Sequence, residues 1–153
     1  MTHDKMFATV SGSFRQAMSE IQDAVYTLTD AGVPVLSPAD PRVVDNFGDF
    51  LFVASDRLRT IRTVQSRHLA AIANSNFVWL VSPAGYVGIS ASMEIGFAAA
   101  HGVPVYADTP PMDLTIRQYV TIVGSIREAI AREKARMKSD EYTPKATVAD
   151  YCS

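Results

Sequence analysis

Short apolar segments alternate with longer amphipathic stretches along most of the chain. The apolar segments, interpreted as strands, are Met6–Val10, Val33–Leu36, Phe77–Val81 and Val103–Ala107. Residues 114–123 are ambiguous, although Tyr119–Val123 has strand-like β-branching. Helices are predicted over residues 17–28, 63–73 and 125–137, and over a stretch that contains Glu94 and ends at His101 and Gly102. This alternation predicts an α/β fold: a single Rossmann-like or flavodoxin-like three-layer sandwich with a mostly parallel sheet of about five strands.

Two loops of this predicted fold fall at the carboxyl ends of strands, where open parallel sheets bind ligands. They are Ser11–Arg15 and Ala84–Glu94, and we expect them to line one pocket. Ser11, Gly12 and Ser13 would place hydroxyls and backbone N–H groups at a helix N-terminus, where a phosphate or sugar can bind, and Arg15 would add a charge-assisted bond. The alternative is a tight turn with an N-cap serine.

Glu94 is the only formally charged side chain between Leu69 and Ala107. An ionised group alone in apolar surroundings costs free energy, and a helix N-terminus can offset that cost. We expect Glu94 to be held ionised in the first turns of its helix, as a nucleophile or general base. The alternative is a helix-dipole partner; a capping box would need Ser or Thr where the chain has Ala91.

Residues 43–66 have an irregular pattern in which Phe47, Phe50 and Phe52 are interleaved with charged residues. A loop of this length is often a functional lid, and its aromatic residues could stack on a nucleobase. Packing of a short strand or helix against the sheet is the more common explanation. In residues 127–138, charges of both signs indicate a solvated helix face, opened by a Ser125–Glu128 capping box.

The composition of the chain mainly excludes classes of binding partner. The 153 residues suit one domain, predicted to span residues 1–138 and to be followed by a polar tail, 139–153. The net charge of −2 argues against nucleic acid as a partner. No apolar run suits a membrane span, the N-terminus lacks a signal-peptide core, and the single Cys152 has no intrachain partner, so we expect a cytoplasmic protein with no membrane partner. No side-chain cluster has metal-ligand spacing, so neither a metal nor a cofactor is predicted.

Three segments together resemble the nucleoside 2-deoxyribosyltransferase superfamily, which includes the deoxynucleoside 5′-monophosphate N-glycosidases. They are SGSFR, RHLAAIANSNFVWLV and GYVGISASMEIGFAAAHGVPVY, within residues 6–107. The resemblance implies cleavage or exchange of an N-glycosidic bond in a nucleoside or nucleotide, through a covalent glycosyl-glutamate. It also implies a homo-oligomer whose sites borrow residues from a neighbour.

The same resemblance assigns roles to individual residues. Glu94 matches the nucleophile. Gly12, Ser13 and Arg15 match the loop that contacts the 5′-phosphate, and Gly88, Ser90 and Ser92 fall in the loop that contacts sugar or phosphate, at a spacing that differs by about one residue.

The chain departs from the family pattern at three positions. Thr9 replaces a tyrosine that steers the nucleophile, His68 replaces an acidic residue that manages the proton of the leaving base, and Asn76 replaces a common aspartate. His68 is either a general acid, since an unperturbed histidine titrates near neutrality, or a structural replacement. The alternative function is therefore a non-catalytic nucleotide-binding or sensing module on the same fold, and a weaker one is an interaction protein.

Overall fold

Five parallel strands form the central sheet of the computed structural model, which describes residues 5–139 and residue 148. The strand order is β2-β1-β5-β6-β7, and each neighbouring pair is parallel. The strands are β1 (Ala8–Gly12), β2 (Val35–Ser37), β5 (Phe77–Val81), β6 (Val105–Ala107) and β7 (Thr121–Ile122). The predicted α/β fold with a mostly parallel sheet of about five strands is confirmed.

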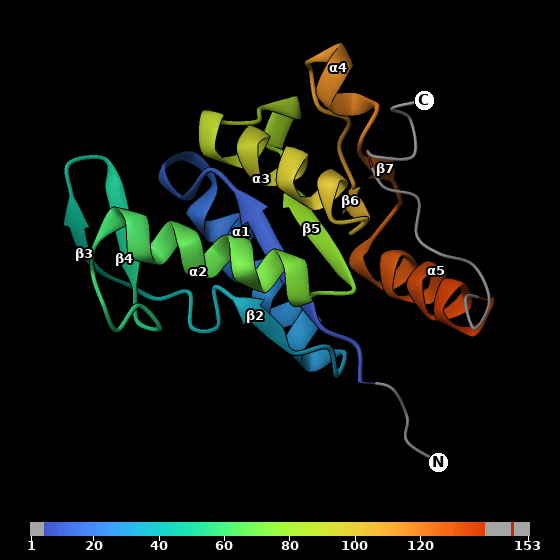
Figure 1. Cartoon of the computed structure of the whole chain (residues 1–153), viewed down its shortest axis with the longest axis horizontal. Helices are drawn as coiled ribbons and strands as arrows, with labels where there is room; N and C mark the ends of the chain where they lie inside the picture. The colour runs from blue at the N-terminus through green and yellow to red at the C-terminus, as the bar shows by residue number, and fades with distance from the viewer. Residues whose placement is uncertain (1–4, 140–147, 149–153) are drawn as a thin grey trace.

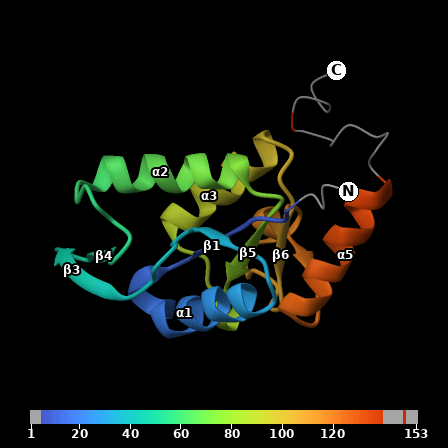
Figure 2. The same ribbon diagram turned by 90° about the horizontal axis from the view of Figure 1, so that it is seen from below.

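Helices cover both faces of this sheet, as Figures 1 and 2 show. They are α1 (Phe14–Asp30), α2 (Ile61–Asn74), α3 (Ile89–Ala100), the short α4 (Leu114–Arg117) and α5 (Ile126–Ser139). Helices α1 and α5 pack on one face, and α2 and α3 pack on the other. No helix among the described residues is both long and apolar enough to cross a membrane.

Strand β5 is a continuous apolar run because both of its faces are buried. Phe77, Trp79 and Val81 belong to the core under α1 and α5, whereas Val78 and Leu80 belong to the core under α2 and α3. All five residues are buried. A central strand of a parallel sheet is covered on both faces, so alternation between polar and apolar residues disappears there.

The interpretation of residues 43–66 as a lid-like loop is wrong, whereas short strands, part of the alternative interpretation, are present. The segment forms an antiparallel hairpin of β3 (Val43–Phe47) and β4 (Phe50–Val53), followed by the start of α2. The turn is Gly48–Asp49, where Gly48 has a φ of +57° that suits glycine. Figure 1 shows the hairpin extending from one end of the molecule, apart from the central sheet.

Helix α5 departs from its predicted character at one residue. The predicted solvated face is present, since Arg127, Arg132, Lys134 and Lys138 are exposed, but Glu133 is fully buried. The Tyr106 hydroxyl donates to Glu133 Oε2 at 3.0 Å, and Arg136 forms an ion pair with the same carboxylate. Glu128 accepts a bond from the Gly124 N–H and donates its own N–H to Ser125 Oγ, so the predicted capping box is shifted by one residue on one side. Of the predicted polar tail, residues 139–153, only Ser139 and Val148 are among the described residues, and Cys152 is not.

Candidate functional site

A cavity of about 250 Å³ opens at the carboxyl edge of the sheet, between the ends of β1 and β2, the hairpin, and helices α2 and α3. It takes side chains from all of these elements. The residues that line it are Gly12, Ser13, Phe14, Arg15, Ser37, Pro38, Asp49, Phe50, Leu51, Val53, Asp56, Val64, Gln65, His68, Tyr86, Gly88, Ile89, Ser90, Ala91 and Glu94. The two predicted loops, after β1 and before α3, therefore do line one pocket.

Glu94 is the buried acid of this cavity, with 6% of its surface exposed. Its Oε1 accepts a hydrogen bond from Gln65 Nε2 at 3.2 Å and lies 3.3 Å from His68 Nε2. Its Oε2 is buried and has no hydrogen-bond partner among the described residues. One carboxylate oxygen is thus fixed by α2, and the other is left unsatisfied in a side chain that lines the cavity.

The ionisation of Glu94 differs from the prediction. Burial raises its pKa from 4.5 to about 7, against the smaller opposing effects of hydrogen bonds from Gln65 and Ser11. Glu94 is the sixth residue of α3, and the first turn of that helix contains no acidic residue. The helix N-terminus acts mainly within the first turn, so it does not hold Glu94 strongly ionised as expected. Desolvation dominates instead.

His68 is buried beside Glu94, with both ring nitrogens engaged. Nδ1 lies 2.6 Å from the Ser37 hydroxyl, and Nε2 lies 3.3 Å from both Ser11 Oγ and Glu94 Oε1. Burial lowers the pKa of His68 to about 4. The contact with Glu94 is therefore that of a neutral imidazole near neutral pH, not a salt bridge.

These contacts define the roles of the two imidazole nitrogens when Glu94 is ionised. An ionised carboxylate favours a proton on the nitrogen that faces it, so Nε2 carries the proton, with Ser11 Oγ as its hydrogen-bond partner, and Nδ1 accepts from the Ser37 hydroxyl. The geometry favours His68 as a group that orients Glu94 over a general acid for a leaving base. The sequence analysis missed Ser37 and Gln65. Their only signals were a polar residue at the end of β2 and one on the inner side of α2.

Only part of the predicted phosphate-binding loop lines the cavity. Gly12, Ser13 and Arg15 line the cavity, whereas Ser11 is fully buried next to His68 and is not part of the lining. Ser13 is also the N-cap of α1, and its Oγ accepts from the Gln16 N–H at 3.3 Å, so both of its predicted roles remain open. A Cβ at Gly12 would lie 2.9 Å from the Val81 carbonyl oxygen, so this position requires glycine.

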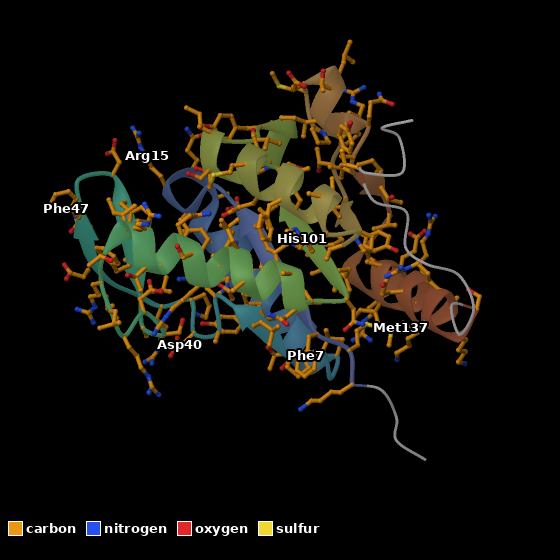
Figure 3. All side chains as sticks on the ribbon, viewed as in Figure 1. Phe7, Arg15, Asp40, Phe47, His101 and Met137 are labelled. Atoms are coloured by element: carbon orange, nitrogen blue, oxygen red, sulfur yellow. The ribbon has the colours of Figure 1, made fainter. Side chains whose placement is uncertain are left out.

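Arg15 is exposed and already has an anionic partner, Asp49 of the hairpin turn, at 3.0 Å. Figure 3 shows Arg15 and Phe47 at the hairpin end of the molecule. Gly88, the N-cap of α3, and Ser90 line the cavity, but Ser92 does not, because its hydroxyl donates to the Gly88 carbonyl within α3.

The three aromatic residues of the hairpin have different environments. Phe50 lines the cavity and packs edge-to-face on Phe52, with ring centroids 5.1 Å apart. Phe52 is buried, and Phe47 is 71% exposed. Only Phe50 is therefore placed to contact a ligand in this cavity.

The remaining residues singled out in the sequence have structural partners. Thr9 Oγ1 lies 2.8 Å from Ser75 Oγ in the core, and Asn76 Oδ1 accepts from the Phe7 N–H at 2.8 Å. His101 lies at the end of α3, where Nδ1 is 2.9 Å from the Phe97 carbonyl and the two rings stack. In the described part of the chain, no group of three His, Cys, Asp or Glu residues is placed to hold a metal ion.

Comparison with known proteins adds no assignment: the chain matches no protein-family model, and a search of curated proteins finds no match.

Proposed function

We propose that this protein cleaves or exchanges the N-glycosidic bond of a nucleoside or nucleotide, with Glu94 as the nucleophile. The observation that carries the proposal is Glu94 Oε2, a buried acceptor without a partner in a side chain that lines the cavity. A buried carboxylate oxygen left unsatisfied is costly, and such groups concentrate at functional sites. The resemblance of residues 6–107 to the nucleoside 2-deoxyribosyltransferases supports the same role for Glu94.

The proposed reaction has two displacement steps. Glu94 Oε2 bonds to C1′ while the C1′–N bond breaks and its electron pair leaves with the base. Water, or a second base, then attacks C1′ and releases the carboxylate; a water proton passes to solvent or to the departed base. Gln65 holds Oε1 by its hydrogen bond, and the neutral His68 ring lies 3.3 Å from the same oxygen, so that the attacking atom is Oε2.

Base release from a panel of nucleosides and 5′-monophosphates, followed by chromatography, tests the proposal. Glu94→Gln removes the nucleophile and keeps the size of the side chain, so release should stop while the far-ultraviolet spectrum is unchanged. Glu20→Gln makes the same change at an exposed site outside the cavity and should retain activity. Base release that survives Glu94→Gln would exclude this nucleophile.

The second candidate is a non-catalytic nucleotide-binding module. The raised pKa of Glu94 favours it, because a carboxyl group that is partly protonated at neutral pH can donate a hydrogen bond to a base. The module would be thermally stabilised by a nucleotide and would release no base from any member of the panel. Turnover that depends on Glu94 would exclude it.

We also propose that the protein is a homo-oligomer, and a cytoplasmic location remains a prediction from sequence. Apolar side chains are exposed at the cavity, Tyr86 and Ile89, and at Met93 of α3; Ile89 is 94% exposed. Exposed apolar patches commonly mark interfaces. Light scattering coupled to size exclusion should give a mass above 16.7 kDa, and Ile89→Lys should lower it. A monomer in the unmodified protein would contradict the proposal.

A further inference from the structure

The cavity carries an excess of negative charge. Its described lining contains the acids Asp49, Asp56 and Glu94 and two basic side chains, Arg15 and His68, of which His68 is neutral near neutral pH. Arg15 is already paired with Asp49. Asp56 Oδ2 accepts from the Val53 N–H at 2.8 Å, and no described lysine or arginine forms an ion pair with Asp56. Two carboxyl groups of the lining, Asp56 and Glu94, therefore lack a cationic partner.

Apart from Glu94, which must be ionised to act as the nucleophile, the described lining also lacks a free proton donor of suitable acidity for a leaving base. Both nitrogens of His68 are engaged, by Ser37 on one side and by Ser11 and Glu94 on the other. Burial lowers the pKa of His68 to about 4, so it carries no extra proton near neutral pH. The other polar groups of the lining are hydroxyls and an amide, which donate hydrogen bonds but are weak acids.

An ordinary nucleobase leaves C1′ as an anion unless it is protonated during the reaction, so a site without a general acid cleaves it slowly. A base whose ring nitrogen is already positive has no such requirement. When its bond to C1′ breaks, the electron pair neutralises the ring nitrogen and the base leaves uncharged. Phe50 lines the cavity on the hairpin, and the face of an aromatic ring attracts a cation.

We propose that the substrate is an N-glycoside whose base carries a positive charge, either an N-alkylated purine or a pyridinium. This inference rests on the proposed function and specifies its substrate class. Glu94 Oε2 bonds to C1′ as the C1′–N⁺ bond breaks; water then attacks C1′, the carboxylate leaves, and the water proton passes to solvent. No step needs a proton donor from the protein. Asp56 and Phe50 recognise the cationic ring, and the loop at Gly12–Arg15 stays free for the sugar end.

The test compares base release from matched substrates that differ in charge. Guanosine is paired with 7-methylguanosine, and nicotinamide riboside represents the pyridinium class. Each kcat/KM is divided by the spontaneous hydrolysis rate of the same compound, because cationic glycosides are intrinsically labile. We expect the corrected value for a cationic substrate to exceed that for guanosine by about tenfold or more. Comparison of the two cationic compounds identifies which class is preferred.

Two variants separate recognition of charge from catalysis. Asp56→Asn keeps an oxygen that can accept from the Val53 N–H but removes the charge, and should reduce the preference for the cation by about fivefold or more. Asp30→Asn makes the same change at an exposed site outside the cavity and should leave the preference unchanged. A fivefold fall with Asp30→Asn as well would contradict recognition by Asp56.

Failure of this inference is distinguishable from failure of the proposed function. Equal corrected rates for neutral and cationic substrates, both lost in Glu94→Gln, would overturn the substrate inference and leave the nucleophile in place. No release from any substrate by the folded protein would overturn the proposed function. In that case calorimetry with 7-methylguanosine and guanosine decides the charge preference alone: tighter binding of the cation supports it, and equal binding refutes it.

Discussion

Burial of Glu94 and His68 should make the free energy of unfolding depend on pH, and a variant that lacks one of the two residues should reveal this dependence. Burial raises the pKa of Glu94 from 4.5 to about 7. Between these values the folded state keeps a proton that the unfolded state has released, so stability falls as pH rises. At 1.36 kcal/mol per pH unit, the total loss contributed by Glu94 is about 3 kcal/mol.

His68 makes the opposite contribution. Burial lowers its pKa from 6.5 to about 4, so between these values the unfolded state binds a proton that the folded state excludes. Its contribution to stability therefore rises with pH, again by about 3 kcal/mol in total. Between pH 4.5 and 6.5 the two contributions change by equal and opposite amounts, so the pair adds no pH dependence to the stability of the wild type.

Substitution of either partner removes this cancellation. In Glu94→Gln the contribution of Glu94 is absent, so the free energy of unfolding relative to the wild type should rise by about 3 kcal/mol from pH 4.5 to 7. In His68→Gln the contribution of His68 is absent, so the free energy of unfolding relative to the wild type should fall by about 3 kcal/mol from pH 4 to 6.5. Urea unfolding at half-unit pH intervals measures both differences.

The double variant is the matched control, because it removes both titrations and should follow the wild-type pH dependence between pH 4.5 and 6.5. The reasoning would be refuted if the two single variants showed slopes of the same sign. It would equally be refuted if the difference between Glu94→Gln and the wild type changed by less than about 1 kcal/mol across the Glu94 window.

Three further predictions concern single contacts. Gln65→Leu removes a hydrogen bond that lowers the pKa of Glu94, so the acidic limb of the kcat/KM profile should move to higher pH, and an unmoved limb would exclude Gln65 from tuning the acid. Glu133→Ala removes the acceptor of the buried Tyr106 hydroxyl and the ion-pair partner of Arg136, and it should cost about 3 kcal/mol in urea unfolding, whereas a cost below about 1 kcal/mol would mean that these contacts add little. Gly85→Ala should lower the melting temperature more than Gly48→Ala. Both glycines have a positive φ, but only at Gly85 would an added Cβ meet backbone, at 2.8 Å from the Pro110 carbonyl oxygen. Equal losses of melting temperature in the two variants would contradict this clash.

The sequence predicted the central sheet because periodicity reports burial directly. An apolar run such as Phe77–Val81 has few alternatives in a chain that alternates strands and helices. The hairpin was missed because β3 is exposed along its whole length and has no apolar alternation. A usable signal was nevertheless present: Gly48–Asp49 between two phenylalanines is a two-residue hairpin turn, and Phe47 does pair with Phe50.

A site residue could be predicted where its chemical type differs from that of its neighbours in the sequence. Glu94 stood out as the lone charge in an apolar helix, and it lines the cavity. Ser37 and Gln65 could not be identified in this way, because they are ordinary polar residues whose importance arises from contacts with His68 and Glu94 made across the fold. Glu133 was misassigned for the same reason, since its burial depends on Tyr106 of a distant strand.

Together, the proposed nucleophile Glu94 and the proposed cationic base predict whether ligand binding releases a proton or takes one up. A cationic base near Glu94 would favour the ionised carboxylate and lower its pKa, whereas a neutral nucleoside would remove remaining solvent and raise it further. Linkage then requires that the cation bind more tightly as pH rises through 7 and that its binding release a proton, while a neutral ligand takes one up. Calorimetry of Glu94-containing protein in two buffers of different ionisation enthalpy measures the sign. Proton release with 7-methylguanosine, and uptake or no exchange with guanosine, is the expected result. Uptake with both would mean that Glu94 does not sense the charge of the base, so the acid and the cation would not share the cavity.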